Sequence, residues 1–340
     1  MDVSHSILFS VILTGILIAA FGFSNGFRDS ATIVATVVST RALSPRAAFF
    51  WCAILEFAGA LLLGKAVVAT VGKKIILNGV NISPYVMLLV VDSALLAAIV
   101  WGVISWWQAW PISNNQALLS GFVGAVAAAL GFKEINYSVM AVVFLVLIIS
   151  PLIAFLLSLF ITKIIRSVGE WMTVKVRPYA DKLHVIFCLL VSCAHGSNDG
   201  QIMMALFLLA FGSALGTQND VPVPVRLFVA FCIGFGVLMG GNRLLKKIGM
   251  RFYQIQPTQG LGAQMTSALT ILTCSTSGFP ASAMQVITGS VVGAGAAKTP
   301  KSVRWHIAKE VVFSWFITLP IVGGLAFCFC SILLRMAGLS

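Results

Sequence analysis

The sequence predicts an all-α, polytopic membrane protein built from two similar halves. Hydrophobic residues make up 59% of the 340 residues and charged residues only 9%, whereas a soluble domain carries about 25% charged residues. Apolar runs of about 20 residues, the length of a bilayer-spanning helix, recur along the chain. Short polar segments interrupt these runs at matching positions in both halves. We therefore expect a multi-pass protein of the cell membrane, embedded in the lipid bilayer, with no separate soluble domain.

The formal net charge of +12 comes from Lys and Arg residues in the short gaps between apolar runs. Basic residues at such positions determine membrane topology, so we expect no nucleic-acid partner. The seven cysteines all lie in apolar stretches and form no C-x-x-C pair. This pattern is typical of small buried side chains and indicates neither disulfides nor a metal site.

The first half begins with an apolar run that a polar segment interrupts. Apolar residues 7–23 and 31–40 flank the polar segment 24–30, which contains Gly26 and Asp29. A carboxylate in hydrocarbon is costly and marks a functional site by default. A glycine beside it favours a broken helix, which is tolerated where protein or a water-filled cavity covers it. Further spans are expected at residues 47–70, 85–101 and 139–165.

A second polar segment, residues 111–116, lies between the last two of these spans. The Gly- and Ala-rich stretch 117–130 that follows is too short to cross a bilayer comfortably. We therefore expect a re-entrant hairpin at this place.

The longest polar segment, residues 163–182, separates the two halves. It holds five Lys or Arg residues against two acidic residues, and such an excess is typical of a cytoplasmic loop. The predicted organisation is a first transmembrane repeat over residues 1–165, a cytoplasmic linker over 166–184 and a second transmembrane repeat over 185–340.

The same pattern restarts after the linker, and its spacing indicates a repeat. Apolar sequence surrounds residues 194–201, which again combine glycines with a carboxylate, Asp199. Asp29 lies 170 positions before Asp199. Four hairpin residues return 169 positions later, namely Pro111, Ser113, Gln116 and Gly124 as Pro280, Ser282, Gln285 and Gly293. Two halves with paired, Gly-rich polar segments are typical of a secondary transporter, whose site lies at the repeat interface near the bilayer midplane.

The two kinds of polar segment offer complementary chemistry. Hairpins that end inside the membrane point helix N-termini into a cavity, where backbone N–H groups and the helix dipole favour an anion. Asp29 and Asp199 would repel a bare anion, so they either bind the coupling cation, Na⁺ or H⁺, or accept a hydrogen bond from a protonated oxyanion. Phosphate near pH 7 still carries a P–OH group whereas sulfate carries no proton, which favours phosphate.

The motifs resemble those of the inorganic phosphate transporter (PiT) family over nearly the whole chain. The segments that carry the resemblance are Gly22–Leu43, Ala194–Met204, the hairpins at Pro111 and Pro280, Pro257–Gly260 and Thr318–Pro320. The segment His195–Gln201 is the most specific, because it looks like the family's second-repeat motif almost unchanged. The resemblance implies symport of phosphate with Na⁺ or H⁺, an inverted repeat and a homodimer. We expect no cofactor beyond the coupling ion.

Several positions depart from the family pattern. Arg28 stands where the family has Asn or His, and Thr32 stands where it has Asn. The family's hairpins are rich in Ser and Thr and end in His, whereas both hairpins here end in Gln. Arg28 adds a fixed positive charge. Our hypothesis is that it either replaces one coupling ion or clamps the anion directly, as a guanidinium does well.

We predict that substrate and coupling ion share one site. The predicted substrate-binding residues are Arg28, Asp29, Ser113, Asn114, Asn115, Asn198, Asp199 and Ser282. The predicted coupling-ion residues are Asp29, Thr32, Glu56, Asn198 and Asp199. Glu56 belongs to this set because it is an intramembrane acid. For Asp92 and His195, a purely structural role is the alternative to a functional one.

The sequence is also compatible with three alternatives to phosphate symport. Permeation of sulfate or another oxyanion stays possible because the hairpin changes fall where the anion should bind. A non-transporting sensor paralogue is the second alternative, because hairpin hydroxyls and the hairpin His are missing. The third is an enzyme, since His195, Ser197 and Asp199 are the residue types of a nucleophilic triad. On a helix, however, Ser197 points away from the other two, so we predict that the protein is not an enzyme.

Overall fold

The fold is a bundle of helices. The computed structural model describes residues 3–339 apart from 63, 65, 77–81, 109, 172–173, 216–220 and 241–253. Within these residues the only β feature is an isolated bridge between Ile76 and Ile135, which confirms the predicted all-α class. The α-helices are α1 Val3–Ser39, α2 Pro45–Leu62, α3 Ala66–Lys74, α4 Pro84–Gln108, α5 Asn114–Leu130, α6 Tyr137–Glu170, α7 Arg177–Leu215, α8 Val223–Leu238, α10 Pro257–Thr276, α11 Ala283–Lys298 and α12 Trp305–Met336.

The outer surface of the bundle is that of a membrane protein. Five of the described helices, α1, α2, α4, α6 and α12, are long and apolar enough to cross a membrane. Large apolar side chains such as Leu152, Phe231 and Phe313 are exposed on the outside, where a soluble protein would present polar groups. The protein is therefore a multi-pass membrane protein, as predicted.

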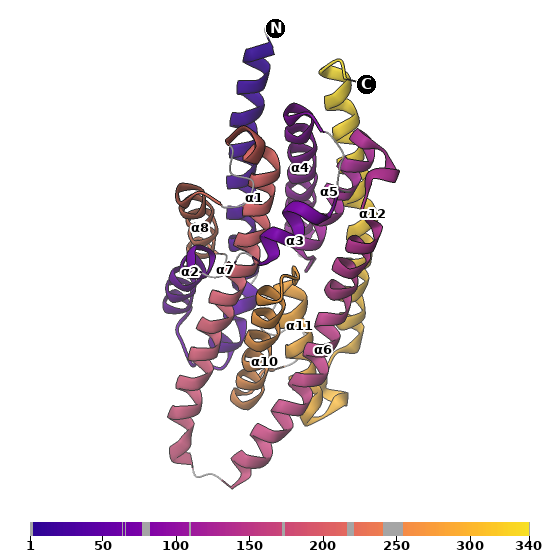
Figure 1. Cartoon of the computed structure of the whole chain (residues 1–340). Coiled ribbons are helices and arrows are strands. Elements are labelled where there is room, and N and C mark those ends of the chain that lie inside the picture. The colour runs from indigo at the N-terminus through magenta and orange to yellow at the C-terminus, as the bar shows by residue number, and fades with distance from the viewer. Residues whose placement is uncertain are drawn as a thin grey trace.

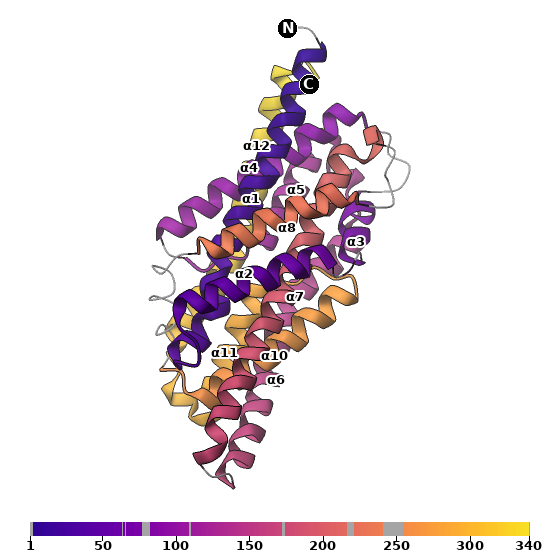
Figure 2. The ribbon, with the colours of Figure 1, turned by 90° about the vertical axis from the view of Figure 1, so that its left-hand side faces the viewer.

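The two halves exchange packing partners. The long helix α6 of the first half packs on the short helix α11 of the second, and α12 packs on α5 in the same way. Likewise α2 packs on α7, and α1 packs on α8. Both termini lie at one end of the molecule, while α6 and α7 join at the opposite end (Figures 1 and 2). This pairing is what a two-fold repeat produces, although the inverted orientation and the division into two repeats stay predictions.

The prediction of broken helices at the two Asp motifs is wrong. α1 and α7 are continuous through residues 24–30 and 194–201. The glycines in these motifs allow close helix packing instead. A Cβ at Gly196 would overlap the backbone carbonyl of Glu56 on α2, and a Cβ at Gly26 would overlap that of Ile233 on α8. The site is therefore formed by unbroken, tightly crossed helices.

Helices α5 and α11 begin at the two places where hairpins are expected. α4 and α5 pack together, as do α10 and α11, and Figure 1 shows the second pair nearer the end where α6 meets α7. Ser113 caps α5, because its hydroxyl accepts from the backbone N–H of Gln116 at 3.1 Å. Ser282 caps α11 in the same way, by accepting from the backbone N–H of Gln285 at 3.3 Å. The re-entrant position of the hairpins in the bilayer stays a prediction.

The predicted linker over residues 166–184 is largely helical where it is described. α6 continues to Glu170, a short 3₁₀ turn covers Val174–Val176, and α7 begins at Arg177. The long polar segment therefore forms the ends of two helices that project from the bundle (Figure 1). Its cytoplasmic position stays a prediction.

Glycines at equivalent positions hold the two halves together. A Cβ at Gly124 on α5 would overlap the backbone of Gly323 on α12, and a Cβ at Gly293 on α11 would overlap that of Phe155 on α6. We expect Gly124→Val to destabilise the fold by at least about 1–3 kcal/mol, the typical cost of overpacking. The measurement is thermal unfolding in detergent, followed by size-exclusion chromatography.

Gly324→Ala on α12 is the matched control, because no described residue outside the local helix backbone lies within 4 Å of the added Cβ. This variant should unfold at the wild-type temperature or slightly above it, since Ala favours a helix more than Gly does. Equal unfolding temperatures for Gly124→Val and the wild type would contradict the close contact between α5 and α12.

Candidate functional site

Three carboxylates and one histidine meet in the centre of the bundle, and we call them the carboxylate cluster. α1 contributes Asp29, α2 contributes Glu56, and α7 contributes His195 and Asp199, whose spacing of four residues puts both on one helix face. Each of the four is at most 4% exposed. His195 lies between the acids, with Nε2 3.5 Å from Asp29 Oδ2 and 3.1 Å from Asp199 Oδ2, and Nδ1 2.9 Å from Glu56 Oε2.

Amide side chains surround Asp199. Its Oδ2 accepts from Asn25 Nδ2 at 2.6 Å, and its Oδ1 accepts from Asn115 Nδ2 at 2.8 Å and from Asn198 Nδ2 at 2.7 Å. A buried carboxylate is costly unless hydrogen bonds and opposite charges compensate it. Three amide donors from three helices therefore fix Asp199 in one position and stabilise it there.

The segment that leads into α11 is tied to the same place. Asn198 pairs with the backbone of Ala281 in both directions, accepting from its N–H at 3.0 Å and donating to its carbonyl at 2.7 Å. Asn115 donates to the same carbonyl at 2.8 Å. Gln285 Nε2 also donates to Gln116 Oε1 at 2.8 Å, so residues 169 positions apart touch. The N-terminal ends of α5 and α11 therefore meet beside the carboxylate cluster.

Asn114 connects α5 to α1. Its Nδ2 donates to Asn25 Oδ1 at 2.7 Å and to Asp29 Oδ1 at 3.2 Å, and its Oδ1 accepts from Arg28 Nη1 at 2.8 Å. One side chain thus contacts an amide, a carboxylate and a guanidinium.

Most of the predicted site residues come together in this arrangement. The residues in or beside the carboxylate cluster are Arg28, Asp29, Glu56, Asn114, Asn115, Asn198 and Asp199. The hydroxyl of Thr32 donates to Met284 Sδ at 3.2 Å, near the N-terminus of α11, rather than to a residue of the cluster. Asp92 accepts from Thr14 at 2.6 Å. The functional roles of these residues stay predictions.

Sequence reasoning missed two members of the site, Asn25 and Ala281. Asn25 stands 170 positions before His195, so the repeat spacing that linked Asp29 with Asp199 could have found it. Ala281 contributes only backbone groups, and no sequence signal marks it. The Ser197 hydroxyl contacts Ser275 at 3.2 Å and Gln201 at 3.1 Å, on the side expected from its helical position.

The charge and the free acceptors of the site suit a cation. Donor atoms of Asp29, His195 and Asp199 lie within 4.8 Å of one another. Three carboxylates stand against two basic groups, Arg28 and His195, so when all are ionised the site carries excess negative charge. Within the described structure, Glu56 Oε1 and Asn115 Oδ1 are buried acceptors without a hydrogen-bond partner. A bound cation, a proton or the O–H group of a ligand would satisfy them.

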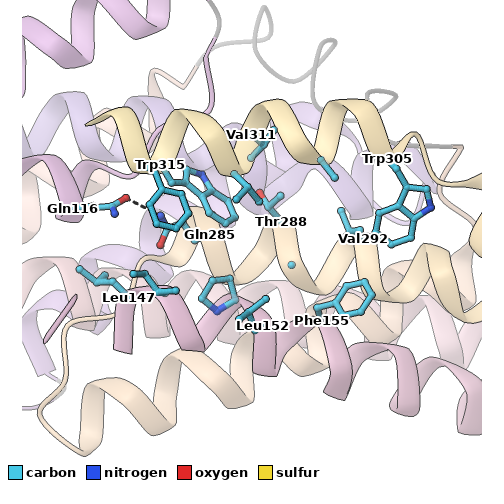
Figure 3. A pocket seen from close by; sticks show the side chains of 16 residues that line it. Gln116, Leu147, Leu152, Phe155, Gln285, Thr288, Val292, Trp305, Val311 and Trp315 are labelled. Carbon is cyan, nitrogen blue, oxygen red and sulfur yellow. Dashed lines mark hydrogen bonds between the residues drawn. The ribbon is translucent and has the colours of Figure 1, made fainter. Parts of the chain in front are cut away.

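A separate cavity of about 430 Å³ lies between α6, α11 and α12. Figure 3 shows the Gln116–Gln285 pair and Trp315 at one end, and Phe155 and Trp305 at the other. Its lining carries no charged side chain. An inorganic oxyanion needs charged or convergent polar partners, so this cavity does not suit one.

Comparison with known proteins identifies the family. Residues 25–326 match the phosphate transporter family. A Bacillus subtilis (strain 168) protein described as a probable low-affinity inorganic phosphate transporter is 35% identical over 321 residues, covering 93% of this chain and 94% of the relative. A Rhizobium meliloti (strain 1021) protein with the same description is 34% identical over 318 residues, covering 91% and 92%.

A solved structure has the same fold. It is described as the sodium-dependent phosphate transporter and superimposes with a TM-score of 0.85, covering 96% of this chain and all of its own, at 22% identity. The proteins named in these matches are transporters, so the predicted absence of enzymatic activity is confirmed. Both the sequence motifs and the fold lead to the same conclusion: the chain belongs to the phosphate transporter family.

Proposed function

We propose that the protein carries inorganic phosphate across the cell membrane by symport with Na⁺ or H⁺. The observation that carries this proposal is the buried carboxylate cluster at the meeting point of two helix N-termini. Intramembrane acids are rare and costly, and they mark ion pathways. Helix N-termini favour anions. A site that combines both features binds a cation and an anion together, which is what symport requires.

The cation would bind at Asp29, Asp199 and Glu56. For Na⁺, the carboxylate oxygens would be joined by the unpaired Asn115 side-chain oxygen, since hard cations prefer oxygen ligands. For H⁺, the carboxylates and His195 would carry the proton. The geometry is compatible with both ions.

The anion would bind beside the N-termini of α5 and α11. Ser113 and Ser282 each use one acceptor lone pair as helix cap, which leaves the hydroxyl proton free to donate to an oxyanion. The neighbouring carboxylates and Asn115 Oδ1 accept hydrogen bonds, so they suit phosphate, which retains a P–OH group. Sulfate has no such proton, and it stays the alternative substrate.

The two halves would then alternate around this site. The exchanged packing of α5 with α12 and of α11 with α6 supports an inverted repeat, in which the halves rock against each other. We also propose a homodimer, which light scattering of the purified protein would test.

Uptake into proteoliposomes tests the proposal. Labelled phosphate and, separately, labelled sulfate are offered under an imposed inward Na⁺ gradient, and then under an inward proton gradient. We expect phosphate uptake driven by one of the two gradients and absent from empty liposomes. Sulfate uptake without phosphate uptake would show that the substrate is sulfate rather than phosphate. Uptake of neither anion would favour a non-transporting paralogue.

A further inference from the structure

Positions 28 and 198 are equivalent in the two halves but carry different residues. Arg28 precedes Asp29 as Asn198 precedes Asp199. Asn198 uses both its amide oxygen and its amide nitrogen on the backbone of Ala281. It therefore ties α7 to the second hairpin, and its hydrogen-bonding capacity is largely used. Arg28 introduces a charge at the corresponding place in the first half.

Arg28 forms no direct ion pair within the described part of the chain. Arg28 is 3% exposed, and its Nη1 donates to a neutral group, Asn114 Oδ1. No carboxylate oxygen of a described residue lies within the 4.0 Å that defines an ion pair. Asp29 lies nearby, because both side chains bond to the amide of Asn114. Without a direct ion pair, however, the buried guanidinium is only partly compensated, and it is therefore suited to receive an anion.

The surroundings of Arg28 favour an anion as well. Its partner Asn114 is the first residue of α5, where the helix dipole is positive and N–H groups are unpaired. Gly102 on α4 leaves room for the guanidinium, because a Cβ there would lie 2.9 Å from Arg28 Nη1.

The second hairpin lacks the two amide side chains of the first. Ala283 and Met284 occupy the positions that correspond to Asn114 and Asn115. Met284 accepts the hydroxyl proton of Thr32 at its sulfur, so neither Ala283 nor Met284 offers an oxyanion a side-chain donor. The side-chain donors for an oxyanion are thus concentrated where α1 meets α5.

We propose that Arg28 binds the transported oxyanion directly, on the side of the carboxylate cluster where α1 meets α5. This inference rests on the proposed function and names the residue that sets its substrate affinity. A guanidinium pairs with two phosphate oxygens at once. A residue that replaced a coupling cation would lie between Asp29 and Asp199, and that place is held by His195. Arg28 therefore does not take the place of a coupling cation. The oxyanion is therefore bound asymmetrically although the fold is repeated.

The test compares Arg28→Gln and Arg28→Lys with the wild type in proteoliposomes, measuring the KM for phosphate and the dependence of uptake on the coupling cation. We expect Arg28→Gln to raise the KM about 10- to 100-fold, the range of a lost charge-assisted hydrogen bond. Arg28→Lys should recover part of the affinity, because it keeps the charge without the planar fork. The number of cations moved per phosphate should stay unchanged.

Arg46→Gln is the matched control, since it removes an exposed Arg at the start of α2 and should keep the wild-type KM. Gly102→Ala is a second variant that leaves the charge in place but displaces the guanidinium, and it should also raise the KM. If Arg28→Gln does not fold, Gly102→Ala and Arg28→Lys decide the question.

Two results would overturn the inference. One is an unchanged KM for phosphate in the Arg28 variants and in Gly102→Ala. The other is an increase in the number of cations moved per phosphate in Arg28→Gln, because Arg28 would then replace a coupling cation. Failure of the wild type to take up phosphate would instead refute the proposed function.

Discussion

Asp199→Asn is expected to abolish gradient-driven phosphate uptake, with a loss of about 100-fold or more. The size follows because a contact with a charged group contributes up to about 3 kcal/mol, and about 1.4 kcal/mol corresponds to a factor of ten in rate. Asp199 accepts from Asn25, Asn115 and Asn198 and touches His195. An asparagine would turn an amide donor toward these amide donors and would remove a negative charge that attracts the cation. The measurement is initial uptake of labelled phosphate at saturating cation.

Asp92→Asn is the matched control for this prediction. Asp92 is also a buried acid, but it pairs with Thr14 between α1 and α4, outside the carboxylate cluster. Its variant should keep at least about half of the wild-type uptake, because no proposed ligand contacts Asp92. Similar losses in both variants, with both proteins folded, would mean that general damage rather than the cluster explains the effect.

The repeat spacing was the most informative feature of the sequence. It linked Asp29 with Asp199, and in the structure both contact the same nitrogen of His195. Equal spacing predicts such a meeting because equivalent residues lie at equivalent depths on equivalent helices. The same reasoning applied to Asn25 would have completed this part of the site.

The hairpin serines lie in a pattern that predicts a helix cap as well as an anion donor. A Ser followed three residues later by Gln is typical of a helix N-terminus, and both hairpins contain this pattern at Ser113 and Ser282. The serines were predicted as anion donors only, whereas the structure shows them as helix caps. Both roles are compatible, since the cap uses the oxygen and the anion would use the proton.

Contacts between distant helices could not be predicted from one sequence. A glycine such as Gly196 predicts a helix break from sequence alone, since no local pattern reveals that the backbone of Glu56 crosses α7 at that point. The place of Thr32 in the motif predicts a coupling-ion ligand, whereas its contact with Met284 on α11 is not evident from the motif. The contact between Glu56 and His195 follows from the crossing of α2 and α7, which no local pattern encodes.

His195→Gln is expected to destabilise the folded protein by about 3–5 kcal/mol, the usual cost of leaving a buried charge network without one partner. His195 is the group that Asp29, Glu56 and Asp199 share. Without it, three buried carboxylates face one another, and their repulsion is strong in a medium of low dielectric constant. Thermal unfolding in detergent measures the loss. If Na⁺ is the coupling ion, high Na⁺ should restore part of it, because a bound ligand stabilises the folded state.

A double variant separates the network from simple loss of packing. Glu56→Gln together with His195→Gln removes one of the competing carboxylates, so it should be more stable than His195→Gln alone. His184→Gln is the matched control on α7, because this buried histidine contacts Thr36 at 3.1 Å and Thr40 at 3.4 Å rather than acids. It should lose only about 1 kcal/mol, the value of an ordinary hydrogen bond. The comparison also needs Glu56→Gln alone. If the stability losses of the two single variants simply add in the double variant, the two residues are not coupled. The carboxylate cluster would then not be the electrostatic unit that symport requires.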